Sequence, residues 1–274
     1  MVIPTVFSDE TWLRLALDSI RSQSTQVLLR IVGQPSDGLL ALAAEYDAEF
    51  IHEEGRSLSE ALNQGFSDLP STVKFIGWLG DDDLLAPDSL ALTQRALQES
   101  PSAPFVFGRV RYIESDGTSK WLIRPGRWAV RYGRWGHNFI AQQGGLIRRS
   151  SFEEVGGIDN SLQNSMDQDL FLKLAATGRP SYLATELGAW RIHAASISSQ
   201  KGSRDESKQV MRRYRPRLPA LVDAVVTLAV KFTDRILLSA HCRVPGPPPP
   251  KFKGHFYTKL KPASSPVNRE TIDE

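Results

Sequence analysis

The stretch VKFIGWLGDDDLLAP, at residues 73–87, is the part of the sequence that decides the fold. Its apolar first half predicts a buried strand over residues 73–79, and three consecutive aspartates follow at residues 81–83. Pro87 suits the first turn of a helix expected at residues 87–98. Open α/β sheets bind ligands beyond the carboxyl ends of their strands, so the sequence predicts a ligand site at the three aspartates.

Upstream of this stretch, short apolar runs alternate with helical patterns. Ser8 or Asp9 is expected to cap the first helix. Alternation of this kind predicts parallel strands joined by helical crossovers. The expected strands are residues 2–6, 27–32 and 50–51, and the later helices are residues 39–46, after a turn at residues 35–38, and residues 58–66.

Downstream, the pattern changes from strand–helix alternation to a hairpin and then to mixed elements. The expected fold class is therefore α/β, with a Rossmann-like, mostly parallel sheet, helices on both of its faces and a mixed α+β second half. The expected elements are a hairpin of residues 105–113 and 121–123, an apolar segment at 144–147, a helix at 167–176, and strands at 181–183 and 189–193.

The chain divides into three expected parts, because its composition shifts twice near the carboxyl end. Residues 1–203 form the α/β domain, residues 204–243 a helical extension, and residues 244–274 a proline-rich tail that is predicted to be disordered. In the extension, an amphipathic helix is expected at about residues 218–240. Its apolar face fits a membrane surface, the protein's own core or a partner.

The net charge and the cysteine content limit the partners and the location that can be expected. The net charge of +2 gives no reason to expect nucleic acid as a partner. The single cysteine, Cys242, fits a reducing compartment, and no apolar run reaches the roughly 18 residues that a membrane span needs. The expected location is the cytoplasm, with peripheral contact at the inner face of the membrane if the amphipathic helix binds lipid.

The three aspartates Asp81, Asp82 and Asp83 have two interpretations. Adjacent carboxylates repel one another unless a cation compensates, and oxygen ligands suit Mg²⁺ or Mn²⁺ that bridges two phosphates. Alternatively, an acidic turn simply caps the helix that begins near Pro87.

Several short motifs follow one another along roughly 190 residues of the chain. They are Val2-Ile3-Pro4-Thr5 with Ser19 and Gln23, Ser36-Asp37-Gly38, Gly55-Arg56-Ser57, the segment ALNQG at 61–65, residues 77–87, GGID at 156–159, DQDLFLKL at 167–174, and Arg191-Ile192-His193 with Ser196 and Ser198. Taken together, these motifs resemble the family 2 glycosyltransferases of the GT-A fold, and their order and spacing make the resemblance specific.

The resemblance implies an inverting transfer of sugar from a nucleoside-diphosphate sugar to a carbohydrate or lipid-linked acceptor hydroxyl, assisted by Mn²⁺ or Mg²⁺, as in glycan or polysaccharide biosynthesis. It implies Asp167 as the catalytic base and Asp82, Asp83 and His193 as metal ligands. The residues that it implies for the donor nucleotide are Pro4, Thr5, Asp37, Arg56, Asn63, Asp81 and Asp82.

This sequence departs from the family pattern at three places. Gly33-Gln34 stands where an aspartate usually follows the second strand, and Gly80 replaces the first acid of the DXD spacing. Val6-Phe7 replaces the customary Tyr-Asn after Pro-Thr. The base of the donor is therefore left open.

Helical spacing supports the role of Asp167, because it shares one face with the apolar residues at 170, 171 and 174. Asp169 lies off that face and is expected to cap the helix or contact solvent. Helix-dipole pairing is the alternative role for Asp167.

An arginine- and aromatic-rich stretch lies between the two acidic motifs, at residues 124–135. It suits an acceptor loop that neutralises a diphosphate and stacks on sugars, although single-stranded nucleic acid or a plain hairpin edge would also fit it. The expected acceptor-binding residues are Trp128, Trp135, Gln142 and Gln143.

Two other functions compete with glycosyl transfer. A sugar-phosphate nucleotidylyltransferase also has a doubly wound sheet and metal carboxylates, but it needs a glycine- and arginine-rich first loop that residues 4–7 lack. A degenerate sugar-binding module that lost its donor site is the non-enzymatic alternative.

Overall fold

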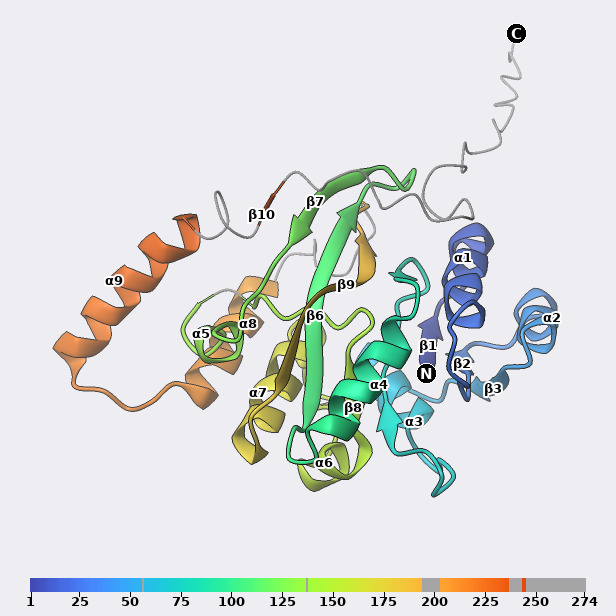
Figure 1. Ribbon diagram of the computed structural model, residues 1–274, viewed down its shortest axis with the longest axis horizontal. Helices are drawn as coiled ribbons and strands as arrows, with labels where there is room; N and C mark the ends of the chain where they lie inside the picture. The colour runs from blue at the N-terminus through green and yellow to red at the C-terminus, as the bar shows by residue number, and fades with distance from the viewer. Residues whose placement is uncertain (56, 137, 194–202, 237–242, 245–274) are drawn as a thin grey trace, which may run out of the picture.

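The computed structural model describes residues 1–55, 57–136, 138–193, 203–236 and 243–244. A three-stranded parallel sheet lies beside a larger mixed sheet, and helices cover both (Figure 1). The smaller sheet contains β1 (Val2–Thr5), β2 (Arg30–Gly33) and β3 (Glu49–His52), in that order, with Val2 opposite Arg30. The predicted α/β fold and the parallel pairing of these strands are confirmed.

The three crossover helices are α1 (Glu10–Arg21), α2 (Asp37–Glu45) and α3 (Leu58–Gly65). Each begins with a capping side chain that accepts a backbone N–H bond, as isolated helix ends require. The capping residues are Asp9, as expected from the sequence, Ser36 and Ser57. The expected turn at residues 35–38 is thus partly the first turn of α2.

The strand expected at residues 73–79 is much shorter in the structure. β4 is Phe75–Ile76, and it pairs antiparallel with β8 (Leu146–Arg148). From Gly77 onward the chain binds β1 instead, because the Val2 N–H donates to the Gly77 carbonyl and the Leu79 N–H to the Val2 carbonyl. This switch of partners joins the two sheets just before the acidic turn, residues 81–83.

The larger sheet is built around β6 (Phe105–Ile113) and β7 (Ser119–Ile123), which form the predicted hairpin. β9 (Ser181–Arg191) pairs parallel with β6 and antiparallel with β5 (Leu84–Leu85). The two strands predicted at 181–183 and 189–193 are therefore one strand. Its register with β6 shifts twice, which explains the break in the apolar pattern between them.

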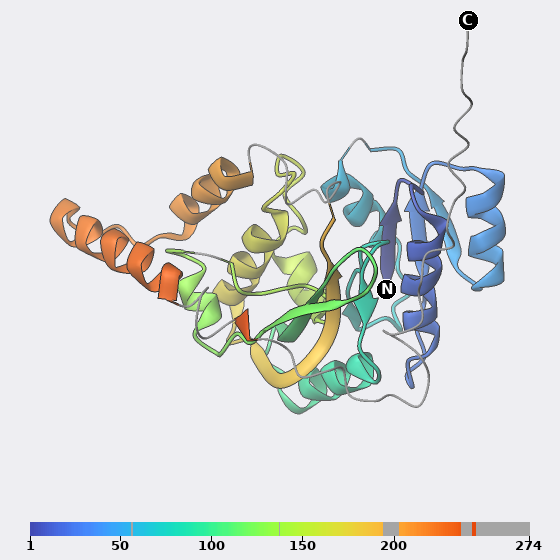
Figure 2. The same cartoon turned by 90° about the horizontal axis from the view of Figure 1, so that it is seen from above.

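Alternate side chains of the sheets enter two separate hydrophobic cores. Phe105 belongs to the core that contains Phe171 of α7 (Met166–Thr177), and the next residue, Val106, belongs to the core that contains Leu90 of α4 (Ser89–Glu99). Figure 2 shows α4 and α7 on opposite sides of the larger sheet. The expected helices on both faces are thus confirmed.

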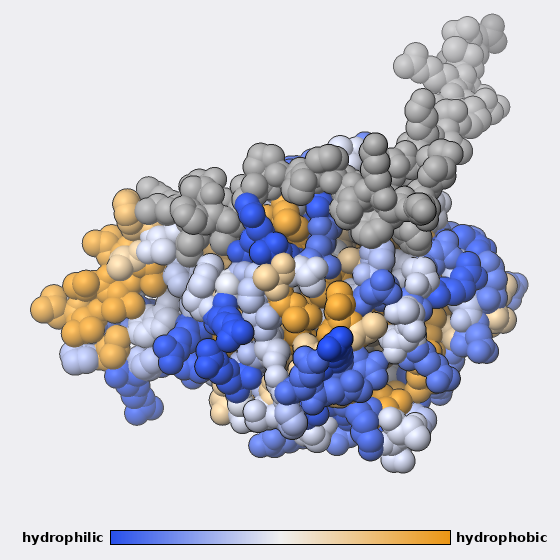
Figure 3. All heavy atoms as spheres, in the orientation of Figure 1, coloured by the Kyte–Doolittle hydropathy of each residue, from blue (hydrophilic) through white to orange (hydrophobic). Residues whose placement is uncertain are grey.

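The helical extension has two helices in the described residues, α8 (Ser203–Tyr214) and α9 (Ala220–Ile236). α8 packs on α7 with Val210 fully buried, so it is part of the compact structure rather than an appendage. α9 lies at the edge of the molecule, and Figure 3 shows a hydrophobic surface over it. Two short helices, α5 (Ala129–Tyr132) and α6 (Arg149–Glu154), and the strand β10 (Arg243–Val244) complete the fold.

Of the tail expected at residues 244–274, all but the first residue lies outside the described residues. Within the part of the chain that is described, no helix is long and apolar enough to cross a membrane.

Candidate active site

The first aspartate of the acidic turn is held by the first strand. The hydroxyl of Thr5 donates a 2.6 Å hydrogen bond to Asp81 Oδ2 and accepts one from the Phe7 N–H. Burial raises the pKa of Asp81, and the bond from Thr5 works in the opposite direction. The Pro-Thr motif and the acidic turn, 76 residues apart, therefore meet at one place.

Asp82 and His193 are in direct contact with one another. Nε2 of His193 is 2.7 Å from Asp82 Oδ2, and both side chains are partly exposed. The ring of Trp12 in α1 lies 4.8 Å from the imidazole ring and fixes its position. Arg191, two residues earlier, donates from Nε to the Asp82 carbonyl, which ties the end of β9 to the acidic turn.

Asp83 is the buried member of the triplet, with 4% of its surface exposed. Its Oδ2 accepts a 2.7 Å hydrogen bond from Gln143 Nε2, and its Oδ1 accepts one from the Arg191 N–H. Burial raises the pKa of Asp83 well above its usual range, and the charge of Asp82 adds to this effect. These contacts make Asp83 a link between the acidic turn, β9 and the loop before β8.

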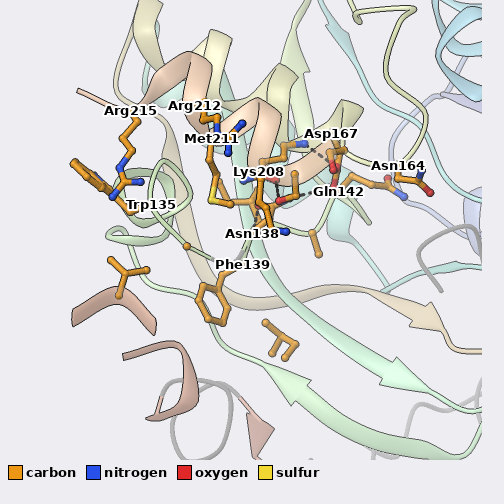
Figure 4. Close-up of a pocket in the computed structure, with 18 of the residues that line it drawn as sticks. Trp135, Asn138, Phe139, Gln142, Asn164, Asp167, Lys208, Met211, Arg212 and Arg215 are labelled. Carbon is orange, nitrogen blue, oxygen red and sulfur yellow. Dashed lines mark hydrogen bonds between the residues drawn. The ribbon is translucent and has the colours of Figure 1, made fainter. Parts of the chain in front are cut away.

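A cavity of about 1030 Å³, called the large cavity here, lies next to Gln143, the hydrogen-bond partner of Asp83. Figure 4 shows Asp167, Asn138 and Gln142 gathered at one end and Trp135 with Arg215 at the other. Gln143 lines the large cavity and also donates a hydrogen bond to Asp83, so the cavity adjoins the acidic turn. Its walls come from the loop before β8, the amino end of α7, and α8 and α9.

Asp167 lies in the first turn of α7 and faces the large cavity. Burial raises its pKa to about 6; backbone N–H groups lower it, and the charge of Glu206 adds to the rise. The Asn138 side chain donates to Asp167 Oδ2 at 3.3 Å. A carboxyl group with a pKa near neutral, at the wall of a cavity, is suited to accept a proton.

The prediction for Asp169 was wrong. This side chain is fully buried, where the sequence suggested capping or solvent contact. Tyr214 donates a 2.9 Å hydrogen bond to its Oδ1, and Lys173 and Arg213 form ion pairs with the carboxylate. Asp169 thus fastens α8 to α7, and its contacts are structural.

The residues predicted to bind the donor are only partly brought together. Pro4 lies in β1 next to Thr5, and Asp37 is exposed in the first turn of α2, beyond the end of β2. The Asn63 amide bonds both the carbonyl and the N–H of Ile158, so it holds α3 to the GGID segment. Arg56 lies outside the described residues, as do Ser196 and Ser198.

The structure divides the predicted acceptor residues between two cavities. Trp135, Gln142 and Gln143 line the large cavity with Asp167. Trp128 lines a second cavity, on the other side of α5. Two residues of the site, Asn138 and Glu206, were missed by the sequence analysis, because neither belongs to a recognisable local pattern.

The chemistry of the donor set decides whether a divalent cation fits. Among the described residues, no three His, Cys, Asp or Glu side chains form a group that could hold a metal. Asp82 and His193 do offer one carboxylate oxygen and one imidazole nitrogen at adjoining positions. Mg²⁺ is commonly held by one or two carboxylates together with substrate phosphates, so Asp82 fits such an ion, and the imidazole of His193 suits a softer divalent ion.

Comparisons with known proteins show the family to which the chain belongs. The model of glycosyl transferase family 2 matches residues 1–156, more than half of the chain. An uncharacterized glycosyltransferase of Rickettsia felis is 22% identical over 225 residues, which are 77% of this chain and 37% of that protein. This chain therefore spans well under half of the relative's length.

Two solved structures share the fold. Residues 1–349 of S. aureus TarS, in complex with UDP-GlcNAc, match with a TM-score of 0.61 and 14% identity over 87% of this chain and 72% of that chain. The mannosyltransferase PcManGT from Pyrobaculum calidifontis, in complex with GDP-Man and Mn²⁺, matches with a TM-score of 0.56 and 14% identity over 87% and 74%. With the match of the family model, they confirm the resemblance first noted in the sequence motifs: the chain belongs to glycosyl transferase family 2.

Proposed function

We propose that this protein transfers a sugar from a nucleoside-diphosphate sugar to an acceptor hydroxyl, by a single displacement with inversion. One observation carries the proposal: Gln143 lines the cavity of Asp167 and also donates to Asp83 in the acidic turn. One side chain therefore contacts the first acidic motif and lines the cavity that Asp167, of the second motif, faces. The donor is assigned to the edge formed by Thr5 and the acidic turn, and the acceptor to the large cavity.

Asp167 is the general base in this mechanism. Its carboxylate takes the proton from the acceptor hydroxyl as that oxygen attacks the anomeric carbon, and the bond to the nucleoside diphosphate breaks with its electron pair. Asn138 donates a hydrogen bond to Asp167 Oδ2, and the Gln168 N–H donates one to Asp167 Oδ1. Together these two bonds orient the carboxylate. Its pKa near 6 keeps it mostly ionised at neutral pH yet basic enough to act.

Asp82 and His193 are the proposed ligands of Mn²⁺ or Mg²⁺. When bound, the cation would stabilise the negative charge that develops on the leaving diphosphate. Trp12 and Arg191 keep the two ligands in place through the ring contact and the bond to the Asp82 carbonyl. The sequence motifs implied Asp83 as a metal ligand too. Both of its carboxylate oxygens accept hydrogen bonds from the protein, so in this proposal Asp83 positions the acidic turn instead.

The large cavity suits an acceptor that is rich in hydroxyl groups. Three side-chain oxygens of residues that line it are buried and accept no hydrogen bond from the described residues, so a small rotation of each amide would offer an acceptor to a ligand hydroxyl. Arg215 covers the ring of Trp135 at 4.5 Å, which holds that ring rigid in the wall. The three oxygens are Gln142 Oε1, Gln143 Oε1 and Asn164 Oδ1.

A carbohydrate or lipid-linked acceptor, as in polysaccharide biosynthesis, is the proposed substrate class. α9 supports a lipid surface nearby, because five of its apolar side chains are exposed while other residues of the helix line the large cavity. The proposed location is the cytoplasmic face of a membrane, which suits the lone cysteine. The exposed residues are Leu221, Val222, Val225, Leu228 and Phe232.

A thermal-shift panel of UDP, GDP, ADP and CDP, with and without Mn²⁺, tests the donor site on the full chain. Ligands that bind only the native state raise its melting temperature in proportion to the logarithm of their concentration. We expect one nucleotide to stabilise the protein with Mn²⁺ and Asp82→Asn to lose that shift. No Mn²⁺-dependent shift with any nucleotide, and no donor hydrolysis, would instead support a degenerate sugar-binding module.

A further inference from the structure

The second cavity, the basic cavity, has a volume of about 730 Å³ and no role in the transfer described above. It lies between residues 127–134, which include α5, and residues 175–180 at the carboxyl end of α7. Its wall combines one large aromatic ring, Trp128, with four guanidinium groups. These belong to Arg127, Arg131, Arg134 and Arg179.

Several other arginines among the described residues pair with a carboxylate, and the four cavity arginines do not. Arg14 pairs with Glu45 at 2.7 Å, and the buried Arg111 pairs with Glu186. Within the described residues, none of the four cavity arginines forms an ion pair with a carboxylate. Like charges that share one cavity repel one another, so an anionic ligand would relieve an unfavourable arrangement.

Arg134 adds an independent observation. Its Nε atom is buried and has no hydrogen-bond acceptor. Buried donors are almost always paired in folded proteins, and each exception calls for an unseen partner. Nε itself is covered by protein, so a ligand oxygen reaches it only when the Arg134 side chain turns toward the cavity that it lines. Phosphate oxygens match the fork of donors that a guanidinium then presents.

Trp128 gives the cavity a second chemical character. Its side chain is held by edge contacts to Tyr132 and Phe139, with ring centroids 5.6 and 5.3 Å away, and yet 39% of the residue is exposed. A rigid, exposed indole beside cationic groups suits the face of a sugar ring that carries an anion.

The two cavities are neighbours across the chain that follows α5. Arg134 lines the basic cavity, and the next residue, Trp135, lines the large cavity. Consecutive Cα atoms are about 3.8 Å apart, so this short stretch of chain is a common boundary of the two cavities. A saccharide with its reacting hydroxyl at Asp167 that runs along the large cavity toward Trp135 approaches this boundary (Figure 4).

We propose that the basic cavity binds a phosphate group carried by the acceptor saccharide, with Arg131 and Arg134 as its principal contacts and Trp128 against the adjoining sugar. This assignment rests on the proposed function, because it places the acceptor in the large cavity. The same phosphate chemistry occurs in lipid headgroups. The cavity's combination of a sugar-sized aromatic surface with the arginines favours the saccharide.

Calorimetry on the full chain tests the site with glucose 6-phosphate, with glucose, and with phosphatidylglycerol vesicles. We expect glucose 6-phosphate to bind at least about tenfold more tightly than glucose, and Arg134→Gln to remove most of that difference, as loss of a charged hydrogen bond would. Arg131→Gln, at an exposed position, repeats the test if the variant at Arg134 is poorly folded. Arg95→Gln is the matched control, since Arg95 is exposed on α4 and pairs with Glu99.

Two results would overturn the proposal. One is equal affinity for glucose 6-phosphate and glucose; the other is unchanged sugar-phosphate binding in both arginine variants. Vesicle binding that depends on Arg131 while sugar phosphate is ignored would assign the cavity to lipid headgroups and also reject the proposal. Asp82→Asn should bind glucose 6-phosphate normally, which separates a failure of this site from a failure of the donor site.

Discussion

Glu206 holds the backbone that leads to Asp167. Its carboxylate accepts hydrogen bonds from three consecutive N–H groups at residues 163–165, at 2.8, 2.5 and 2.6 Å, and Asp167 follows two residues later. Ser165, at the cap position of α7, makes no capping hydrogen bond with its own side chain, and Glu206 of α8 binds its N–H and those of the two residues before it. The helical extension therefore builds part of the candidate active site.

Replacing Glu206 by glutamine tests this relationship, because it keeps one acceptor oxygen and removes the charge. The charge of Glu206 raises the pKa of Asp167, so its loss should lower that pKa. Since transfer requires ionised Asp167, the acidic limb of the pH–rate profile is expected to move to lower pH. Asp205→Asn, at the preceding exposed position, is the control that should leave the limb in place.

A purely structural role for Glu206 would give another pattern. Glu206→Ala removes the acceptor of these three backbone N–H groups and should lower the free energy of unfolding by about 1–3 kcal/mol, whatever the mechanism. An acidic limb that stays at the same pH in Glu206→Gln, with kcat alone reduced, would contradict the electrostatic link.

Two residues of the acidic turn should differ in their roles: Asp82 in binding and Asp83 in the stability of the fold. Asp82 is partly exposed, so Asp82→Asn should abolish Mn²⁺-dependent nucleotide binding with little change in stability. Asp83→Ala leaves Gln143 Nε2 and the Arg191 N–H without their acceptor. Its free energy of unfolding should fall by about 1–3 kcal/mol in urea denaturation. The division would be wrong if Asp83→Ala were as stable as the parent and Asp82→Asn were not.

The sequence could predict elements whose signals are local. The caps of α1, the hairpin of β6 and β7, and the extent of α7 each depend on residues close together in the chain. The acidic turn could be predicted for the same reason, because a strand, three aspartates and a helix follow one another directly.

Long-range contacts account for what the sequence could not predict. Asp169 lies off the apolar face of α7, and only α8, whose Tyr214 is 45 residues away, buries it. The separation of Trp128 from Trp135 depends on how the chain turns around α5, which the composition of that stretch does not encode. β4 is short because Gly77 exchanges one strand partner for another, and pairing partners are not visible in apolar patterns.

The apolar face of α9 should bind lipid if the proposed setting is correct. Leu228 and Phe232 are 71% and 67% exposed and lie one turn apart. Changing both to serine removes two large apolar groups, each worth about 1.5–3 kcal/mol on burial, so flotation with phosphatidylglycerol vesicles should fall at least about tenfold. Leu92→Ser, at an exposed leucine of α4, is the matched control. Undiminished flotation of the double variant would remove α9 from any membrane contact.

Asp167→Asn should be inactive and yet more stable than the parent at neutral pH. Asparagine is nearly isosteric and can still accept from the Gln168 N–H, but it cannot take the acceptor's proton. Transfer should therefore fall by roughly 10²-fold or more, with little change in Mn²⁺-dependent nucleotide binding. Single-turnover transfer and nucleotide titration measure the two effects separately.

The gain in stability follows from the pKa of Asp167, which burial raises to about 6 from its ordinary 3.8. Between these values the folded protein holds a proton that the unfolded chain has lost, so the stability of the parent falls as the pH rises from about 4 to 6. The charged carboxylate then costs the fold up to about 3 kcal/mol at pH 7, at about 1.4 kcal/mol per pKa unit. The neutral side chain in Asp167→Asn avoids this cost, so the advantage of the variant in urea denaturation should be largest at pH 7 and shrink toward pH 4.5. A variant that transfers sugar at the parent rate would place the base elsewhere, whereas an inactive variant whose stability advantage did not vary with pH would mean that Asp167 is not the group that titrates.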